Sequence, residues 1–301
     1  MTELSVRRPT FDDVDAVVEL GNAFERAFTG SESFRAPDLA HEWRRLDLER
    51  DAWLVLVPGG RIAGYATLES RGERRFTSDG YVHPELRGLG AGSKLADLTE
   101  ERVRQLGGAV VTTGIVSADE AAAELFERRG YRSVRHFYRM AIELGDEPPR
   151  PDWPEGIRPE PFREEEARAV HEAIEEAFAD HWDHRPRPFE LFRDRMIARP
   201  GFDPSLWTVA RAGEEIAGAT ICEAGVHDMG WVHSLSVRRP WRRVGLGRAL
   251  LLNTFRQFHE RGERRVGLGV DAESPTGATR LYERVGMAVV EKDTVFQKEL
   301  R

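Results

Sequence analysis

The stretch Trp231-Val-His-Ser-Leu-Ser-Val-Arg-Arg-Pro-Trp-Arg-Arg-Val-Gly-Leu-Gly-Arg-Ala-Leu-Leu-Leu252 decides the fold of this 301-residue chain. Apolar and other residues alternate over its first seven positions, a pattern typical of a strand with one apolar face. Gly245 and Gly247 follow, one residue apart, and a run of helix-forming residues begins at Arg248. The stretch therefore predicts a strand, a glycine-rich turn and a helix, in that order.

The predicted turn is suited to binding a phosphate. Glycines lack Cβ, so several backbone N–H groups can point at one place, and a helix N-terminus carries about half a positive charge. A Walker loop requires Lys after its last glycine, where this chain has Arg248, and a dinucleotide-binding loop requires a third glycine. The phosphate therefore belongs to another kind of ligand.

Composition excludes several classes of protein. The chain is 40% hydrophobic and 32% charged with a net charge of −8, so a nucleic-acid partner is not expected. Apolar runs of about 18 residues are absent and the first residues do not resemble a signal peptide, so we expect a cytoplasmic protein with no membrane partner. Cys222 is the single cysteine, which excludes an internal disulfide, and we expect it to be buried.

One pattern is written twice along the chain. Corresponding residues recur at offsets of 154 to 156 positions: Trp53 and Trp207, Glu69 and Glu223, Val82 and Val237, Phe126 and Tyr282. An internal repeat of this length predicts two copies of one domain. We interpret the drift in offset as loops of different length between elements that keep their register.

The repeat and a proline-rich segment predict the domain boundaries. Residues 145–156 contain four prolines and are typical of a semi-rigid linker. We expect an N-terminal domain at 1–144 and a C-terminal domain at 157–301. Each half has a strand, one or two helices, further strands, the glycine turn with its helix, another strand, a short helix and closing strands. This order predicts an α+β fold with a mixed, mostly antiparallel sheet.

The pattern Arg242-x-x-Gly245-x-Gly247 resembles the pyrophosphate-binding signature of the GNAT superfamily of acyl-CoA N-acyltransferases. The strand before it, the helix after it and the later Leu281-Tyr-x-x-x-Gly286 are in the family's order, and the first half repeats the arrangement. The resemblance covers nearly the whole chain and implies two tandem GNAT folds. It also implies an acetyl-CoA-dependent N-acetyltransferase that needs no metal.

The resemblance carries cofactor-binding roles onto both turns. It implies that the backbone of the strand contacts the pantetheine arm and that the N–H groups of the turn hold the pyrophosphate. Arg242 and Arg243 add positive charge, unless they are solvated surface residues. The residues concerned are Leu235, Val237, Arg242, Arg243, Val244, Gly245, Leu246, Gly247 and Arg248 in the second half, and Val82, Arg87, Gly88, Gly90 and Gly92 in the first.

The same resemblance implies that catalysis belongs to the second half. Tyr282 stands where the family places the tyrosine that protonates the leaving thiolate, although a core aromatic would fit the same helix. Its counterpart Phe126 has no hydroxyl, so we expect the N-terminal domain to be non-catalytic. Residues 271–277 depart from the family, since its Asn is not seen and the loop is one residue longer.

Three residues are candidates for the general base. The family often has Glu at the place of Trp231, and the nearby alternatives are His233, Glu223 and Asp228. Imidazole has an ordinary pKa of about 6.5, which suits a base acting directly or through water. The choice among the three, or a chain of ordered waters, stays open. We expect the amine to attack acetyl-CoA directly in a ternary complex.

The acceptor site is expected in residues 176–189, between the first two helices of the second half. Trp182 and Asp183 could hold a cationic amine, while Arg185 and Arg187 could meet an acidic group of the same molecule. A plain connecting loop with solvated charges is the alternative. We therefore expect a small amine or amino-acid-like acceptor.

Other functions compete with this prediction. One is a non-catalytic CoA-sensing protein, and another is acetylation of protein N-termini or lysines. His181-Trp-Asp-His184 suggests a metal site, but no fourth ligand has suitable spacing, so no metal is expected. The protein is expected to be a monomer or a homodimer.

Overall fold

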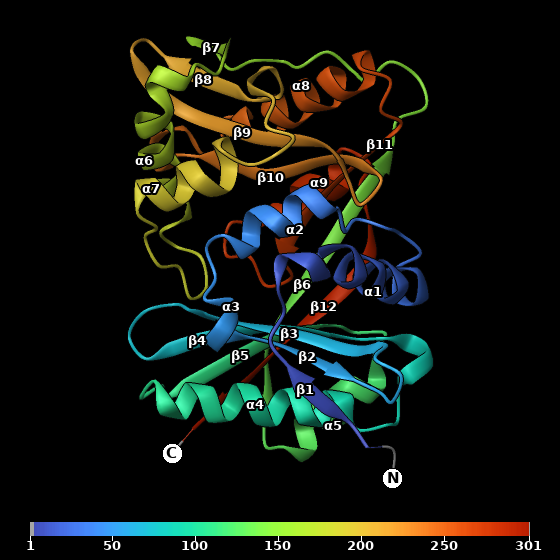
Figure 1. Ribbon diagram of the computed structural model, residues 1–301. Helices are drawn as coiled ribbons and strands as arrows, with labels where there is room; N and C mark the ends of the chain where they lie inside the picture. Colours follow the sequence, from blue (N-terminus) through green and yellow to red (C-terminus); the bar gives the residue numbers. More distant parts are fainter. Residues whose placement is uncertain (1–2, 301) are drawn as a thin grey trace. The chain divides into compact units, whose positions relative to one another are not determined.

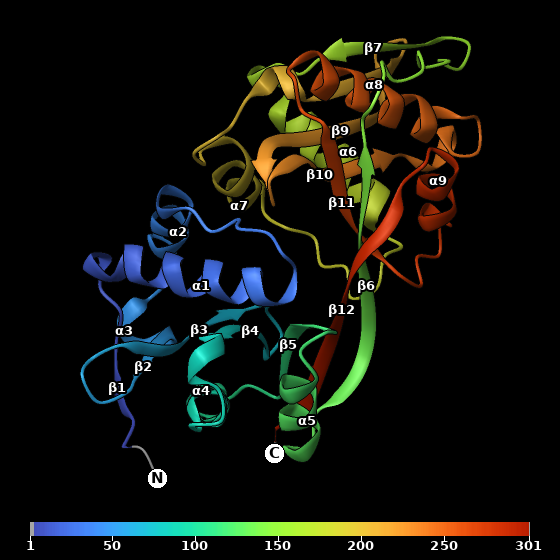
Figure 2. The same cartoon turned by 90° about the vertical axis from the view of Figure 1, so that its right-hand side faces the viewer.

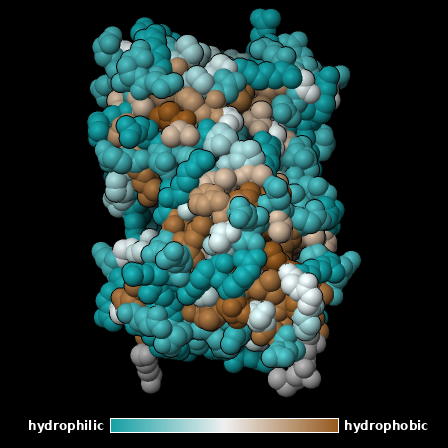
Figure 3. Space-filling view, viewed as in Figure 1, coloured by the Kyte–Doolittle hydropathy of each residue, from teal (hydrophilic) through white to brown (hydrophobic). Residues whose placement is uncertain are grey.

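The computed structural model describes residues 3–300 and divides into two compact units (Figure 1). Residues 3–137 and 291–300 form the first unit, and residues 138–290 form the second. Hydrophilic residues dominate the face shown in the space-filling view (Figure 3). Within residues 3–300, no helix has the length and apolarity needed to cross a membrane.

The first unit is a sheet covered by helices on both faces. Its elements are β1 (Ser5–Arg7), α1 (Val14–Phe28), α2 (Ala36–Trp43), α3 (Leu48–Asp51), β2 (Ala52–Leu56), β3 (Ile62–Ser70), β4 (Arg75–Val82), α4 (Ala91–Gln105), β5 (Val110–Val116) and α5 (Glu120–Arg128). The strands follow the order β1-β2-β3-β4-β5-β12, where β12 is Ala288–Glu299. Only the β4–β5 pair is parallel. Figure 1 shows α1 and α2 on one face and α4 on the other.

The second unit repeats this plan. It contains β6 (Arg132–Glu143) in part, β7 (Ile157–Pro161), α6 (Ala167–Phe178), α7 (Phe189–Phe192), β8 (Thr208–Ala212), β9 (Glu215–Val226), β10 (Met229–Val237), α8 (Leu246–Glu260), β11 (Arg265–Asp271) and α9 (Ala278–Arg284). The strand order is β6-β11-β10-β9-β8-β7, with β10 and β11 parallel. Helices α6 and α8 both contact β9 and β10 (Figure 2). The predicted α+β fold with a mixed, mostly antiparallel sheet is confirmed.

Each unit takes one strand from the other half of the sequence. Residues 293–299 of β12 pair antiparallel with β5 in the first unit. Residues 138–143 of β6 belong to the second unit, where Glu143 forms an ion pair with Arg265 at 3.1 Å. The compact units therefore divide the chain differently from the repeat halves 1–144 and 157–301. Pairing at a sheet edge is a tertiary contact, which local sequence pattern does not specify.

The cores reflect the repeat. Trp53 and Trp207, at corresponding positions, are each 2% exposed. In α8 the apolar side chains pack into the core of the second unit, with Phe255 and Phe258 among the largest buried residues. Cys222 is buried as expected, and burial raises the pKa of its thiol to about 12, which makes it unreactive.

Candidate active site

The central strands of each sheet pair for only part of their length. In the second unit the parallel register runs from Gly230 opposite Val266 to Val232 opposite Leu268, and β10 continues to Val237. On its other side β10 stays paired with β9 along its length. The edge of β10 beyond Val232 therefore lies at a fork between two strands, where its backbone can pair with an extended ligand.

A β-bulge lies at this fork. Val232 is opposite Cys222 and Ser234 is opposite Ile221, so His233 is an extra residue in β10. A bulge takes one residue out of the ladder and re-aims its side chain. The corresponding pairing of β3 with β4 in the first unit has no register shift.

The bulge corrects one interpretation of the repeat. By register, Val232 corresponds to Ser78 and Ser234 corresponds to Asp79, at offsets of 154 and 155. The change from 154 to 155 therefore arises inside a strand, at His233. We had attributed the drift in the repeat offset to loops of different length, and this was wrong for the step from 154 to 155. One extra residue in a strand and one extra residue in a loop change the offset by the same amount, so the sequence does not distinguish them.

The glycine turns of the two units have the same backbone conformation. Gly245 caps the N-terminus of α8 with φ of 94°, and Gly90 caps α4 with the same φ. Two residues earlier, Arg243 and Gly88 have φ of 65° and 77°. Both turns thus lead into 15-residue helices whose first N–H groups have no partner within the helix. The predicted order of strand, turn and helix is confirmed in both units.

The second glycine of each turn permits close packing. A Cβ at Gly247 would lie 3.1 Å from Leu281 Cδ2 on α9, and a Cβ at Gly92 would lie 3.2 Å from Leu125 Cδ2 on α5. A side chain at Gly247 would therefore contact α9 first.

Arg242 connects the turn to its surroundings. Its guanidinium donates hydrogen bonds to the carbonyl oxygens of Val237 (3.1 Å) and Ala177 (2.8 Å) and to Asp180 Oδ2 (3.1 Å). The two arginines therefore differ: Arg242 fixes the end of β10 and of α6, whereas Arg243 is exposed. Hydrogen bonds from Arg239 and Arg242 lower the pKa of Asp180 to about 2.

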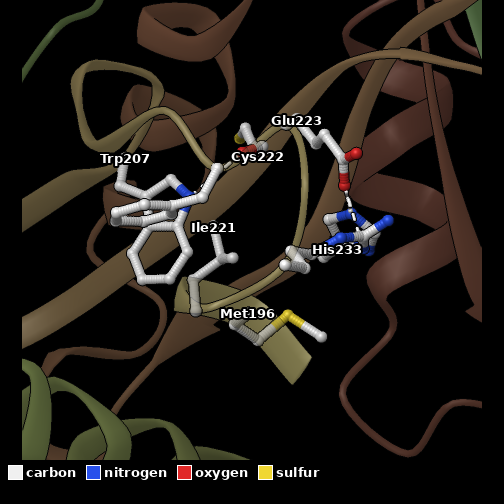
Figure 4. A pocket seen from close by; sticks show the side chains of 9 residues that line it. Met196, Trp207, Ile221, Cys222, Glu223 and His233 are labelled. Atoms are coloured by element: carbon white, nitrogen blue, oxygen red, sulfur yellow. Dashed lines mark hydrogen bonds and ion pairs between the residues drawn. The ribbon is translucent and has the colours of Figure 1, made fainter. Parts of the chain in front are cut away.

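Two of the three candidate bases are in contact. His233 Nε2 lies 2.9 Å from Glu223 Oε2, as the dashed line in Figure 4 shows. Arg199 Nη1 lies 2.9 Å from the same oxygen, and Glu223 is only 4% exposed. An ionised carboxylate only accepts hydrogen bonds, so Nε2 carries the proton and Nδ1 is the basic nitrogen in the neutral ring.

The pair lines a small recess that is open to solvent and has room for about one water molecule. Its lining residues are Met196, Arg199, Gly201, Phe202, Trp207, Ile221, Cys222, Glu223 and His233. Sequence reasoning missed the first four, which follow α7. The turn-forming Pro200-Gly201 pair was the one available signal, and it indicates a turn without indicating a site.

Asp228, the third candidate base, lies in the hairpin turn between β9 and β10. His227 and Asp228 have φ of 52° and 58°, as in a two-residue turn of type I′. Asp228 is not among the residues that line the recess.

Tyr282 lies on α9 with 7% of its surface exposed, inside the core of the second unit. Burial raises its pKa to about 12, so its hydroxyl stays protonated at neutral pH. Phe126 packs against the rings of Tyr131 and Phe296 in the first unit.

The segment expected to bind the acceptor is held against α6. Glu175 accepts a hydrogen bond from the Arg187 backbone N–H at 3.2 Å and lies 3.3 Å from His184 Nε2. Trp182 and Asp183 are not among the residues that line the recess. Within residues 3–300, no group of three or more His, Cys, Asp or Glu side chains is arranged to hold a metal ion.

A strand edge open to an extended ligand and a glycine turn that caps a helix are what the resemblance to acyl-CoA-dependent acyltransferases implies. Residues 17–131 and 167–287 each match the model of the acetyltransferase (GNAT) family. The chain belongs to the GNAT family and carries two tandem copies of its fold. It is an acetyl-CoA-dependent N-acetyltransferase.

Similar proteins share this arrangement over their whole length. A mycothiol acetyltransferase of Catenulispora acidiphila is 32% identical, with 97% of each chain covered. A crystal structure of a GCN5-related N-acetyltransferase from Sphaerobacter thermophilus has 37% identity and a TM-score of 0.83, with 99% of this chain and 96% of that chain covered. A tandem GNAT protein from the clavulanic acid biosynthesis pathway, 18% identical, shares the fold with a TM-score of 0.75, with 99% of this chain and 98% of that chain covered.

Proposed function

We propose that the second half of the chain acetylates a primary amine of a small metabolite by direct attack in a ternary complex. The observation that carries this proposal is the bulge at His233, which brings an imidazole held by a buried carboxylate to the strand fork. The first half has no register shift at the corresponding place.

The cofactor-binding roles follow from the fork and the turn. Acetyl-CoA supplies the thioester. Leu235 and Val237, beyond the end of the parallel register, offer backbone groups to its pantetheine arm. The N–H groups of residues 243–248 hold the pyrophosphate at the N-terminus of α8, whereas that of Arg242 already donates to the carbonyl oxygen of Arg239. Arg242 supports this cradle through its hydrogen bonds to the protein.

Two side chains move the protons. The lone pair of the neutral amine attacks the thioester carbon, and His233 Nδ1 accepts the one proton that the nitrogen loses as the C–N bond forms and the C–S bond breaks. Glu223 holds the ring through Nε2 and stabilises the imidazolium that results. The Tyr282 hydroxyl donates a proton to the departing sulfur, and its raised pKa keeps that proton available.

The first half has the glycine turn but lacks the catalytic features proposed for the second half. Gly88 and Gly90 have positive φ, as Arg243 and Gly245 do in the second half. Phe126 replaces the tyrosine, and the strand before the turn has no bulge against β3. We propose that this half is non-catalytic, and that residues 145–156 are a linker between the two repeats.

A small-molecule acceptor is favoured over a protein. The recess beside Glu223 and His233 is small, and a relative that matches over 97% of each chain is named mycothiol acetyltransferase. We propose that Trp182 and Asp183 contribute to the part of the acceptor site outside the recess. Protein N-termini and lysines are the alternative acceptors.

Release of CoA measured over a panel of acceptors tests the proposal. The panel contains amines, amino acids, aminoglycosides, peptides and intact proteins. We expect turnover with a small amine, and a loss of kcat of roughly 100-fold or more in His233→Gln with acetyl-CoA affinity unchanged. Turnover only with an intact protein, or full activity of His233→Gln, would refute it.

A further inference from the structure

The proposed base is connected to an arginine through one buried oxygen. Glu223 Oε2 lies 2.9 Å from His233 Nε2 and 2.9 Å from Arg199 Nη1. The side chain of Glu223 is 5% exposed, whereas those of Arg199 and His233 are each 20% exposed. Arg199 belongs to the segment between α7 and β8. The three side chains therefore form a cluster in which one negative charge is buried between two groups that can be positive.

The charges of this cluster must nearly balance because the carboxylate is buried. An ion that leaves water without a partner is costly, so a buried carboxylate either keeps a positive charge beside it or takes up a proton. Arginine keeps its charge throughout the physiological pH range, whereas imidazole gains and loses its charge within that range. Arg199 already supplies one positive charge, so Glu223 can stay ionised beside a neutral His233.

The ionisable groups on the neighbouring elements are neutral or come with opposite charges nearby. Those that are not exposed include Cys222 on β9, Asp194 and Arg195 before Arg199, and His171 and Glu175 on α6. Burial raises the pKa of the Cys222 thiol to about 12, so it is uncharged at neutral pH. Helix α6 packs against β9 and β10, and on it Glu175 Oε1 lies 3.7 Å from His171 Nε2. The residues that α8 buries are not ionisable.

We infer that Arg199 is a positioning residue that keeps His233 neutral before the reaction, so that Nδ1 can accept a proton. The inference rests on the proposed function, because it concerns the base assigned there. If Glu223 faced His233 alone, the carboxylate would favour the charged ring as its partner, and an imidazolium has both nitrogens protonated. Arg199 acts through Glu223 and touches no substrate. Glu223 still stabilises the imidazolium that forms when the ring takes a proton from the amine.

The protonation of the His233 ring can be measured without an acceptor. Long-range proton–nitrogen correlation spectra of protein labelled at histidine distinguish a neutral ring with its proton on Nε2 from an imidazolium, and His233→Gln assigns the signals. We expect the neutral ring in the wild type at neutral pH. In Arg199→Met the midpoint of the ring's titration should lie about one pH unit higher or more, because the carboxylate has lost its other cation. An unchanged midpoint would overturn the inference.

Three further variants separate charge from contact. Arg199→Gln can still donate a hydrogen bond to Glu223 but has no charge, so its midpoint should rise as in Arg199→Met, and it serves if the methionine variant does not fold. Arg199→Lys restores the charge and should bring the midpoint back towards that of the wild type. Arg193→Met removes an exposed arginine from the same segment and is the matched control. An equal rise in Arg193→Met would overturn the inference, since it would reflect net charge alone.

The dependence of kcat/KM on pH gives a second readout. A general base must be neutral to act, so activity falls on the acid side as His233 takes up a proton. Arg199→Met should move this acid limb to higher pH by about one unit or more, and activity should recover as the pH is raised. A fall by the same factor at every pH would show that Arg199 has only a structural role, and would overturn the inference.

Failure of the inference and failure of the proposed function have different signatures. Full activity of His233→Gln would refute the proposed function whatever the spectra of the Arg199 variants show. A loss of activity in His233→Gln together with an unmoved midpoint in Arg199→Met would leave the base in place and overturn the inference alone.

Discussion

Arg243 and Gly88 share a left-handed backbone at equivalent places in the two glycine turns, with φ of 65° and 77°. Glycine adopts this conformation freely, whereas an L-residue with a side chain pays about 1–2 kcal/mol. The turn of the second unit therefore keeps a strained arginine where the first unit has a glycine.

Substitutions at Arg243 should reveal this strain. Arg243→Val should lower the free energy of unfolding by about 1–2 kcal/mol, because β-branched residues tolerate positive φ least. Arg243→Gly should not destabilise the protein. Denaturant titration of both variants checks the prediction, and equal stability of the two would show that the turn is not strained at this residue.

The contact between the glycine turn and α9 predicts a coupled pair. Gly247→Ala places a methyl group 3.1 Å from Leu281 Cδ2, so we expect it to destabilise the fold and to weaken acetyl-CoA binding. Leu281→Ala makes room for that methyl. The two substitutions should be non-additive by at least about 0.5 kcal/mol in a double-mutant cycle. Strict additivity would mean that the contact does not limit the residue at 247.

Tyr282→Phe should lower kcat roughly 10- to 1000-fold with little change in acetyl-CoA affinity, since the hydroxyl acts only on the leaving sulfur. Phe126→Tyr is the matched control and should not raise turnover. A variant with wild-type kcat would leave Tyr282 as a core aromatic.

The buried hydroxyl of Tyr282 also has a signature in alkaline unfolding. Its pKa is about 12 in the folded protein, against an ordinary value of 10. The neutral form is thus favoured by folding, and this contribution is complete below pH 10 and is lost as the pH rises through 12. Between these values Tyr282→Phe should lose less stability than the wild type, which thermal denaturation at a series of pH values would measure.

The contribution of Asp180 to folding stability should have the opposite dependence on pH and should be lost in acid. Its folded pKa of about 2 lies below the ordinary 3.8, because Arg239 and Arg242 donate hydrogen bonds to its carboxylate. Its contribution to stability is therefore present above pH 3.8 and is lost as the pH falls through 2. We expect Asp180→Asn to melt at a lower temperature than the wild type at pH 6 in low salt. The difference in melting temperature should disappear near pH 2. It should also become smaller in 0.5 M salt, because salt screens the attraction between Asp180 and the two arginines.

The parts of the site that follow from local pattern could be predicted from the sequence. The turn ending in Gly245 and Gly247 needs residues with special backbone freedom, and their spacing is visible in the chain. The pairing of His233 with Glu223 was within reach because strand alternation places both near the fork. The sequence could not show which of the two is the base, because that depends on which ring nitrogen of His233 faces the Glu223 carboxylate.

Other parts depend on contacts that no local pattern records. The bulge at His233 changes the register by one residue, which the sequence shows only as a shifted offset. Arg199 and Gly201 reach Glu223 through the course of the segment after α7. Nothing in their own neighbourhood along the chain distinguishes them from a surface turn.

The exchange of closing strands makes the two repeats mutually dependent. A fragment that began at residue 157 would carry residues 293–299 without β5, the strand with which they pair. The same fragment would lack residues 138–143, which complete the second unit. A fragment that ended at residue 144 would leave β5 with an open edge, a site for association with other chains. Cutting the chain at the linker would therefore yield two fragments, each without a strand that its sheet needs.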